Sequence, residues 1–214
     1  FSPHANKSSG VSGEKNMAVF FAAKCFAQVL DKSFFSLQKF LRANIRRFYF
    51  QRFCQDVLPA LHSTSGEEAH SSGMLSARMM VYASVPSSVY SQDIPQLLPD
   101  IVSVLSLGDD QSPSVTRLAL LLVSELFKEG SDNVLAFLPR LVPMLGMLCH
   151  PQHSVTLRLL AIRCLHSMLS LPPAAILPFV KGVTDALKVC LDDPKRAVRV
   201  GAVETRNAWF LVKE

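Results

Sequence analysis

The sequence predicts an all-α fold, an α-solenoid of antiparallel helix pairs of the HEAT or armadillo type. A Leu-Pro pair recurs at nearly equal intervals, at positions 98–99, 138–139 and 177–178. An arginine recurs at equal intervals of 41 residues, as Arg117, Arg158 and Arg199. Ten residues after each arginine stands a large apolar residue, namely Phe127, Met168 and Trp209. A period of about 40 residues is typical of stacked helix pairs, which form extended binding surfaces.

The composition fits a continuous core with a partly covered surface. Of the 214 residues, 49% are hydrophobic and 18% are charged, below the roughly 25% charged residues of average soluble domains. A partner could cover the missing polar surface, but helices packed between neighbours on two sides would give the same deficit. The net charge of +5 is modest.

The first residues differ from the rest of the chain. Residues 1–14 are rich in Ser, Gly and Lys without a period, so we expect a mobile segment. Residues 15–214 are expected to form about four and a half HEAT repeats. Because the chain opens with Phe1 instead of an initiator Met, we expect this region to be the C-terminal part of a longer solenoid.

The N-terminal half predicts three helices and one ambiguous segment. Apolar spacing indicates helices over residues 15–31 and 46–61, with a break expected at Pro59, because proline within a helix costs on the order of 3 kcal/mol. Residues 33–45 are ambiguous and could form a short helix. A loop over residues 62–73 precedes a helix over residues 74–83, which Pro86 follows.

Three helix pairs follow, which brings the expected total to nine helices. Their expected spans are residues 93–105 with 112–127, 132–149 with 154–169, and 174–191 with 195–212. In the first pair, Asp93 suits the positive end of a helix dipole, and Ser112-Pro113 suits a cap followed by the first helical residue.

The repeated Leu-Pro and Arg positions predict how the pairs are built. Proline within each first helix is expected to bend it. The arginine that opens each second helix is expected to reach an acidic turn and cross-link adjacent repeats. The turn acids are Asp109 and Asp110 in one repeat and Asp192 and Asp193 in another. His150 and His153 replace them in the middle repeat, so the ladder is expected to be interrupted there.

One cluster of residues could be taken for a metal site, but its spacing is not specific. Cys149, His150 and His153, with Cys164 as a fourth ligand, could suggest a zinc site. Zinc ligands, however, usually occur as two pairs, and the two ligands of each pair are close in sequence. His150 occupies a turn position, and Cys164 lies on an apolar stripe. All five cysteines lie in apolar segments, as buried reduced thiols of a cytosolic or nuclear protein do. We expect no metal and no cofactor.

Catalysis, membrane insertion and nucleic-acid binding are each disfavoured. The sequence has no G-x-S-x-G elbow and no phosphate-binding glycine loop, so we expect no enzyme. No apolar run reaches the roughly 18 residues of a membrane span. Basic residues interleaved with aromatics could bind nucleic acid, but an amphipathic helix with its arginines in solvent explains them better. These basic residues are Arg42, Arg46, Arg47 and Arg52.

The last helix is the most distinctive segment. Its apolar stripe is expected to comprise Val198, Ala202, Thr205 and Trp209, with the only Trp of the chain in the core. Its outer face is expected to be polar, because a terminal repeat has no further repeat to cover it. Val200 and Phe210 are harder to bury and are better contact candidates. The full set of partner-binding candidates is Arg163, His166, Lys195, Arg196, Arg199, Val200, Arg206 and Phe210.

Residues 191–211 resemble the C-terminal end of the MMS-nineteen family, the HEAT-repeat scaffold of cytosolic iron–sulfur protein assembly. The resemblance covers roughly residues 46–214 and is strongest in the last fifty. Its further supports are Arg52-Phe53, Leu58-Pro59-Ala60-Leu61, the segment 161–166 followed by Leu171-Pro172, and Leu177-Pro178-Phe179. The order of these phrases and the Trp-Phe-Leu ending carry the resemblance, since Asp-Asp-Pro-x-x-x-Val-Arg is general to HEAT repeats.

The resemblance implies a non-catalytic adaptor in the cytoplasm and nucleus. Family members join a WD-repeat propeller and a small subunit in a targeting complex. That complex delivers iron–sulfur clusters to apo-proteins of DNA repair and replication. The C-terminal repeats are the part expected to hold the small subunit. The alternatives are a nucleic-acid-binding solenoid and a transport-type adaptor that grips a peptide in its concave groove.

Overall fold

The computed structural model describes residues 72–85, 87, 90–106 and 113–212, with the single positions Phe21, Lys24, Cys25, Phe48 and Arg52. The expected segment 1–14, the helices expected over residues 15–61 and most of the loop expected over residues 62–73 lie outside the described residues. The chain divides into two compact units, residues 1–91 and 92–214, and each is described by itself.

The first unit contains helix α4, Ser72–Ala83, close to the span that the sequence predicts. Its apolar residues Leu75, Ala77, Met79, Val81 and Tyr82 are buried, and Met80 is half-buried. The ring of Tyr82 meets the ring of Tyr90 edge to face, with centroids 5.3 Å apart. This contact fixes the turn that follows α4.

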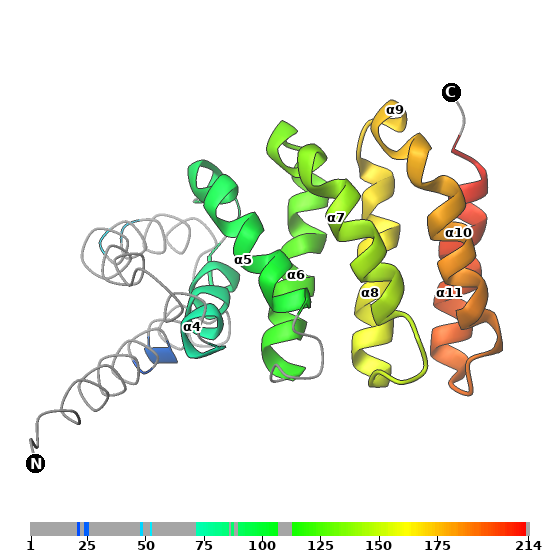
Figure 1. The fold of residues 1–214 in the computed structure, drawn as a ribbon, viewed down its shortest axis with the longest axis horizontal. Helices are drawn as coiled ribbons and strands as arrows, with labels where there is room; N and C mark the ends of the chain where they lie inside the picture. The colour runs from blue at the N-terminus through cyan, green and yellow to red at the C-terminus, as the bar shows by residue number, and fades with distance from the viewer. Residues whose placement is uncertain are drawn as a thin grey trace, which may run out of the picture. The chain divides into compact units, whose positions relative to one another are not determined.

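All regular elements in the described residues of the second unit are helices (Figure 1). A short 3₁₀ turn, η3 (Ser91–Asp93), leads into the first helix. The helices are α5 (Ile94–Ser106), α6 (Pro113–Glu129), α7 (Asp132–Leu148), α8 (Val155–Ser167), α9 (Pro173–Ile176), α10 (Val180–Val189) and α11 (Arg196–Phe210). The predicted α-solenoid is confirmed.

The helices of the second unit form two layers (Figure 1). Helices α5, α7 and α10 pack side by side in one layer, and α6, α8 and α11 pack side by side in the other. Each pair, α5 with α6, α7 with α8 and α10 with α11, is an antiparallel hairpin that joins the layers. Residues one repeat apart in the sequence therefore lie on neighbouring helices of the same layer.

Two helix starts lie close to their predicted positions, whereas the cap expected at Ser112 lies outside the described residues. Helix α6 begins at Pro113, as the sequence predicts. At the start of α8 the Ser154 hydroxyl accepts a hydrogen bond from the backbone N–H of Leu157, at 3.3 Å. Such a bond satisfies one of the N–H groups that a helix leaves unpaired at its first turn.

The prolines act differently in the three first helices. Pro99 lies inside α5 and Pro139 inside α7, and both helices continue through them. Pro178 instead lies in a 3₁₀ turn, η6 (Leu177–Phe179), which separates α9 from α10. The expectation of a single helix over residues 174–191 was therefore wrong.

Two glycines predict opposite effects of the same substitution. Gly130, between α6 and α7, has a φ of 67°, a left-handed conformation that disfavours other residues. Gly182 lies exposed within α10, and a Cβ there would meet no atom within 4 Å. Gly130→Ala should lower the free energy of unfolding by about 1 kcal/mol. Gly182→Ala should raise it by about 0.5–1 kcal/mol. Urea unfolding of both variants measures these changes. A change of the same sign in the free energy of unfolding of both variants would contradict the prediction.

Candidate protein-interaction site

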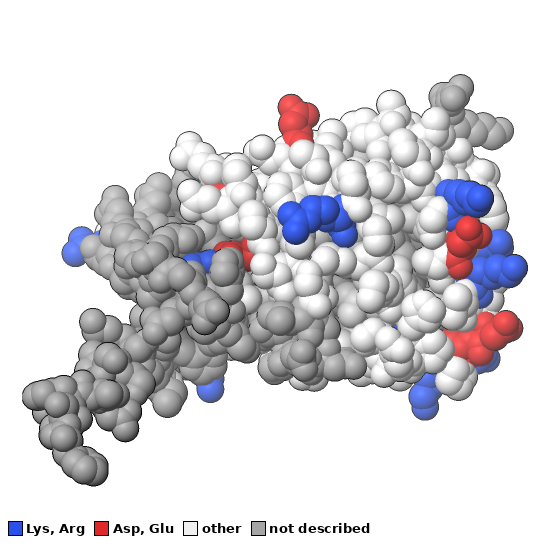
Figure 2. Space-filling model, in the orientation of Figure 1, with Lys and Arg blue, Asp and Glu red and all other residues white. Residues whose placement is uncertain are grey.

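Charged side chains are unevenly distributed over the second unit (Figure 2). The face over α7 carries few of them, whereas lysines, arginines and carboxylates gather at the α10–α11 end. The last hairpin also holds most of the partner-binding candidates of the sequence. The candidate site therefore lies on this hairpin and on the turn that precedes α11.

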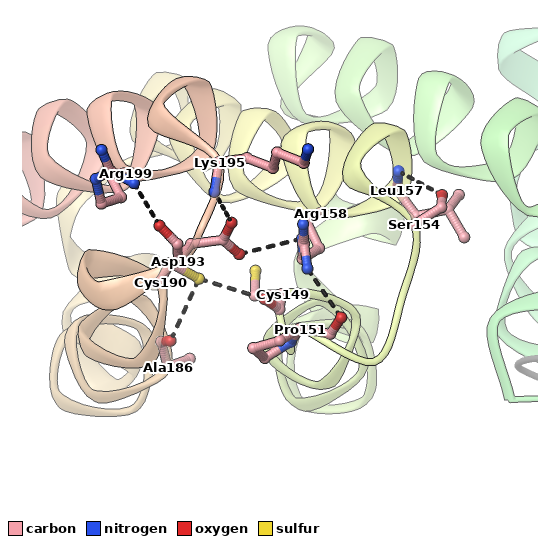
Figure 3. A network of polar contacts seen from close by, with 10 residues as sticks. All are labelled: Cys149, Pro151, Ser154, Leu157, Arg158, Ala186, Cys190, Asp193, Lys195 and Arg199. Atoms are coloured by element: carbon pink, nitrogen blue, oxygen red, sulfur yellow. Dashed lines mark hydrogen bonds and ion pairs between the residues drawn. The ribbon is translucent and has the colours of Figure 1, made fainter.

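An inter-repeat ion pair holds the last two hairpins together (Figure 3). The Nε atom of Arg158, near the start of α8, lies 3.2 Å from Oδ2 of Asp193, in the turn before α11. The side chains are 5% and 0% exposed. Neither of these two atoms has a well-aligned hydrogen bond, so their attraction is chiefly electrostatic. Arg158 also donates from Nη1 to the carbonyl of Pro151, at 2.9 Å.

Asp193 organises the start of α11 at the same time. Its Oδ1 atom accepts the backbone N–H of Lys195 at 2.8 Å, an Asx turn that leads into the helix. Its backbone carbonyl accepts from Nη1 of Arg199 at 2.6 Å. The predicted cross-link between adjacent repeats is thus confirmed for Arg158. Arg117, one repeat earlier, is exposed and forms no ion pair with any described residue.

Two predicted contact residues have structural bonds within the chain. Arg199 is half-buried and committed to the Asp193 carbonyl. Arg206 is half-buried and donates from Nε to the carbonyl of Thr184 in α10, at 3.3 Å. A charge reversal at either position would therefore disturb the hairpin as well as any interface. Lys195 and Arg196, in contrast, are exposed.

Two further candidates line an open groove between α8 and α11. Arg163 and His166 stand on α8, opposite Glu204 and Thr205 on α11, and His166 Nδ1 lies 3.4 Å from the Thr205 hydroxyl. The groove has a volume of about 450 Å³, with the half-buried Leu159 and Leu160 among its walls. We call it the α8–α11 groove; it is lined by Thr156, Leu159, Leu160, Arg163, His166, Gly201, Glu204 and Thr205.

The α8–α11 groove combines an apolar wall with exposed charges of both signs. Arg163 and Glu204 are exposed, and neither forms an ion pair with another described residue. Such a surface suits a protein segment with one apolar side chain between polar ones. Sequence reasoning missed Glu204 and Thr205. The signal was present, because Glu204 stands one repeat after Arg163, at the same spacing that separates Arg158 from Arg199.

The outer side of α11 is more apolar than the sequence predicts. Val200 is 45% exposed, Val203 45%, Phe210 53% and Leu211 76%. The exposure of Val200 and Phe210 was expected, but the expectation of an otherwise polar outer face was wrong, because Val203 and Leu211 add apolar surface on the same side. We call this surface the α11 outer face; it comprises Arg196, Val200, Val203, Asn207, Phe210 and Leu211.

The opposite side of α11 is the core stripe that the sequence predicts. Val198, Ala202, Thr205 and Trp209 are all buried. The Trp209 indole N–H donates to the carbonyl of Leu165 on α8, at 2.9 Å. This bond satisfies the one polar atom of a fully enclosed side chain.

The described cysteines are mostly buried thiols. Cys164 donates to the carbonyl of Leu120 at 3.1 Å, and burial raises its pKa to about 12. The hydrogen bond with the Cys190 thiol, together with burial, raises the pKa of Cys149 well above its usual value. The thiols of Cys149 and Cys164 therefore stay protonated and poorly nucleophilic at neutral pH. Cys25 is exposed, which corrects the expectation for that residue, and Cys54 lies outside the described residues.

Three other features bear on function. His150 is exposed in its turn, and no group of three or more His, Cys, Asp or Glu residues that could hold a metal occurs among the described residues. No helix in the described part of the chain is long and apolar enough to cross a membrane. Of the basic residues that could suggest nucleic-acid binding, Arg42, Arg46 and Arg47 lie outside the described residues, and Arg52 is exposed.

Sequence comparison identifies similar proteins in animals, plants and fungi. Residues 14–169 match a family model described as RNAPII transcription regulator C-terminal. An MMS19 nucleotide excision repair protein homolog of Xenopus laevis is 32% identical over 196 residues, covering 89% of this chain and 18% of that protein. Its Arabidopsis thaliana counterpart is 32% identical, covering 95% of the chain and 19% of that protein. A DNA repair/transcription protein of Schizosaccharomyces pombe, mms19, is 32% identical, covering 76% of the chain and 16% of that protein.

The chain spans about a fifth of the length of these curated relatives. Among solved structures, a designed armadillo repeat protein superposes with a TM-score of 0.54 at 16% sequence identity, covering 96% of each chain. At that identity the likeness concerns the fold alone, and it agrees with the stacked helix pairs described above.

Proposed function

Because the chain belongs to the MMS19 C-terminal family, described as RNAPII transcription regulator C-terminal, we propose that it is a non-catalytic adaptor of cytosolic iron–sulfur protein assembly. In this proposal it holds the small subunit of the targeting complex and cooperates with the WD-repeat subunit. The complex then delivers clusters to apo-proteins of DNA repair and replication. The repair and transcription roles in the names of the relatives support the link to DNA repair in this proposal.

The observation that carries the proposal is the α8–α11 groove. Stacked helix pairs form continuous surfaces on which a protein can dock over several repeats. The groove places an apolar wall between Arg163 and His166 on one helix and Glu204 on the next. We propose that the small subunit docks here, with carboxylates toward Arg163 and a basic or N–H group toward Glu204.

The extent and location of the protein are part of the same proposal. Residues 15–214 would form the C-terminal repeats of a longer solenoid, as the sequence predicts. The protein would act in the cytoplasm and the nucleus, where repair and replication enzymes acquire their clusters and work. Because this chain matches only a fifth of its relatives, contacts with the WD-repeat subunit would involve other parts of the whole protein as well.

A binding measurement with the purified small subunit tests the docking site. The double variant Arg163→Glu, His166→Glu should weaken binding at least tenfold, because it places like charges against the partner's carboxylates. Arg140→Glu is the matched control, since Arg140 is equally exposed but stands on α7 in the other layer. Titration calorimetry with unchanged circular dichroism would report the effect. Equal loss in the control, or no loss in the double variant, would remove the groove from the interface.

A further inference from the structure

The α11 outer face is a second candidate docking surface, separate from the α8–α11 groove. The core stripe of α11 packs on α8 and α10, so the outer face points away from both. No described element covers it. Three of its side chains, Val200, Val203 and Phe210, expose about half of their surface. The clustering of these apolar groups on one helix side distinguishes them from isolated exposed residues.

The spacing of this face fits a helical partner. Arg196, Val200, Val203, Asn207 and Phe210 follow one another at alternating intervals of four and three positions. These are the seam positions of a heptad pattern, which places side chains in register with the gaps of an opposing helix. An amphipathic helix laid along α11 would meet two valines and a phenylalanine in succession.

Phe210 is held in position before any partner binds. The guanidinium carbon of Arg206 lies 4.7 Å from the centroid of the Phe210 ring. Arg206 is itself anchored by its hydrogen bond to the Thr184 carbonyl. A ring fixed by a cation–π contact loses little conformational entropy on binding, which favours its use as an anchor.

The charges around this face indicate the chemistry of the partner. Over α11 and the residue before it, four basic residues stand against one exposed acidic residue. They are Lys195, Arg196, Arg199 and Arg206, against Glu204. Asp193 is also acidic, but it is buried and paired with Arg158. The surplus is three positive charges at the α10–α11 end, where Figure 2 shows charged side chains gathered.

We propose that the α11 outer face docks an amphipathic α-helix of a partner protein, whose apolar stripe is flanked by carboxylates. The apolar stripe would cover Val200, Val203 and Phe210, and the carboxylates would face the basic residues around them. A second copy of this chain suits the surface less well, since it would bring the two positive surpluses together. The inference does not depend on the groove or on the small subunit.

Two synthetic helical peptides provide the test. Both carry leucine at every seam position, and they differ only in having glutamate or lysine at the flanking positions. Fluorescence polarisation with the full chain should show at least tenfold tighter binding of the glutamate peptide. Added salt should narrow this difference, because it screens exposed charges.

Variants locate the binding surface. Val203→Ser combined with Phe210→Ser should lower the affinity for the glutamate peptide at least tenfold. Met147→Ser is the matched control, because Met147 is an exposed apolar residue on α7. The fluorescence of the buried Trp209 verifies in each variant that α11 stays folded.

Three results would overturn the proposal. The first is equal affinity for the two peptides, and the second is binding that the double serine variant leaves unchanged. The third is a concentration-dependent doubling of mass that this variant abolishes, which would identify a second copy as the occupant. The groove variant, Arg163→Glu with His166→Glu, should retain peptide binding. Failure of the small-subunit proposal and failure of this one are therefore distinguishable.

Discussion

Replacement of Asp193 by alanine should destabilise the last hairpin by about 3–5 kcal/mol, the usual effect of removing one partner of a buried ion pair. The substitution leaves the buried Arg158 guanidinium with only the Pro151 carbonyl as a described partner. It also removes the oxygen that accepts the Lys195 N–H at the start of α11. The Arg199 bond survives, because its acceptor is the backbone carbonyl.

Urea unfolding followed by Trp209 fluorescence measures this effect where it should be largest. Trp209 is the only Trp of the chain and is buried between α11 and α8, so it reports separation of the last hairpin. The control is Asp192→Ala, which removes the adjacent and exposed carboxylate and should change stability by less than about 0.5 kcal/mol. Equal effects at the two positions would contradict the role of the cross-link.

A double variant separates the ion pair from the turn. Arg158→Met with Asp193→Leu removes both charges together, so neither remains buried without a partner. Much of the loss seen in Asp193→Ala should then be recovered, since apolar pairs often replace buried ion pairs without penalty. The part that is not recovered measures the Asx turn at Lys195 together with the Arg158 bond to the Pro151 carbonyl, which the double variant also removes. Failure to recover any stability would mean that the buried charge of Arg158 does not account for the effect.

The repeat period predicted more of this structure than any single motif did. It anticipated the two layers, the cross-link from Arg158 and the burial of Trp209, because equivalent residues of neighbouring repeats must meet in a stack. The same period pairs Arg163 with Glu204. The sequence could therefore have predicted that these two residues lie on neighbouring helices, but the α8–α11 groove was not among the expectations.

Other features could not be read from residue type alone. Leu177-Pro178 matches the Leu-Pro pairs of α5 and α7 in sequence, yet only Pro178 interrupts a helix. The repeat pattern does not encode this difference. The full extent of the α11 outer face was also missed. Arg196, Val200 and Phe210 were contact candidates, but Val203 is indistinguishable from a core valine until the core side of α11 is known.

Replacement of Trp209 by alanine should remove about 3–5 kcal/mol from the stability of the last hairpin. The side chain is fully buried, and its loss leaves a large cavity between α8 and α11. The substitution also removes the hydrogen bond from the indole to the Leu165 carbonyl. Among the described helices, α10 and α11 pack on one neighbouring pair, α7 with α8, so the loss falls on that interface.

The neighbouring residue supplies the control for this variant. Phe210→Ala truncates an aromatic side chain of similar size one position further along the same helix, but on the exposed side. It should change stability by less than about 1 kcal/mol, mostly through its contact with Arg206. Trp209→Phe keeps most of the buried volume and removes the hydrogen bond. Its loss of stability should therefore lie between those of Phe210→Ala and Trp209→Ala.

Circular dichroism during urea unfolding follows all three variants without relying on the indole. A loss in Phe210→Ala as large as that in Trp209→Ala would show that the outer face of α11 is already packed in the isolated chain, and the docking surface proposed there would not exist.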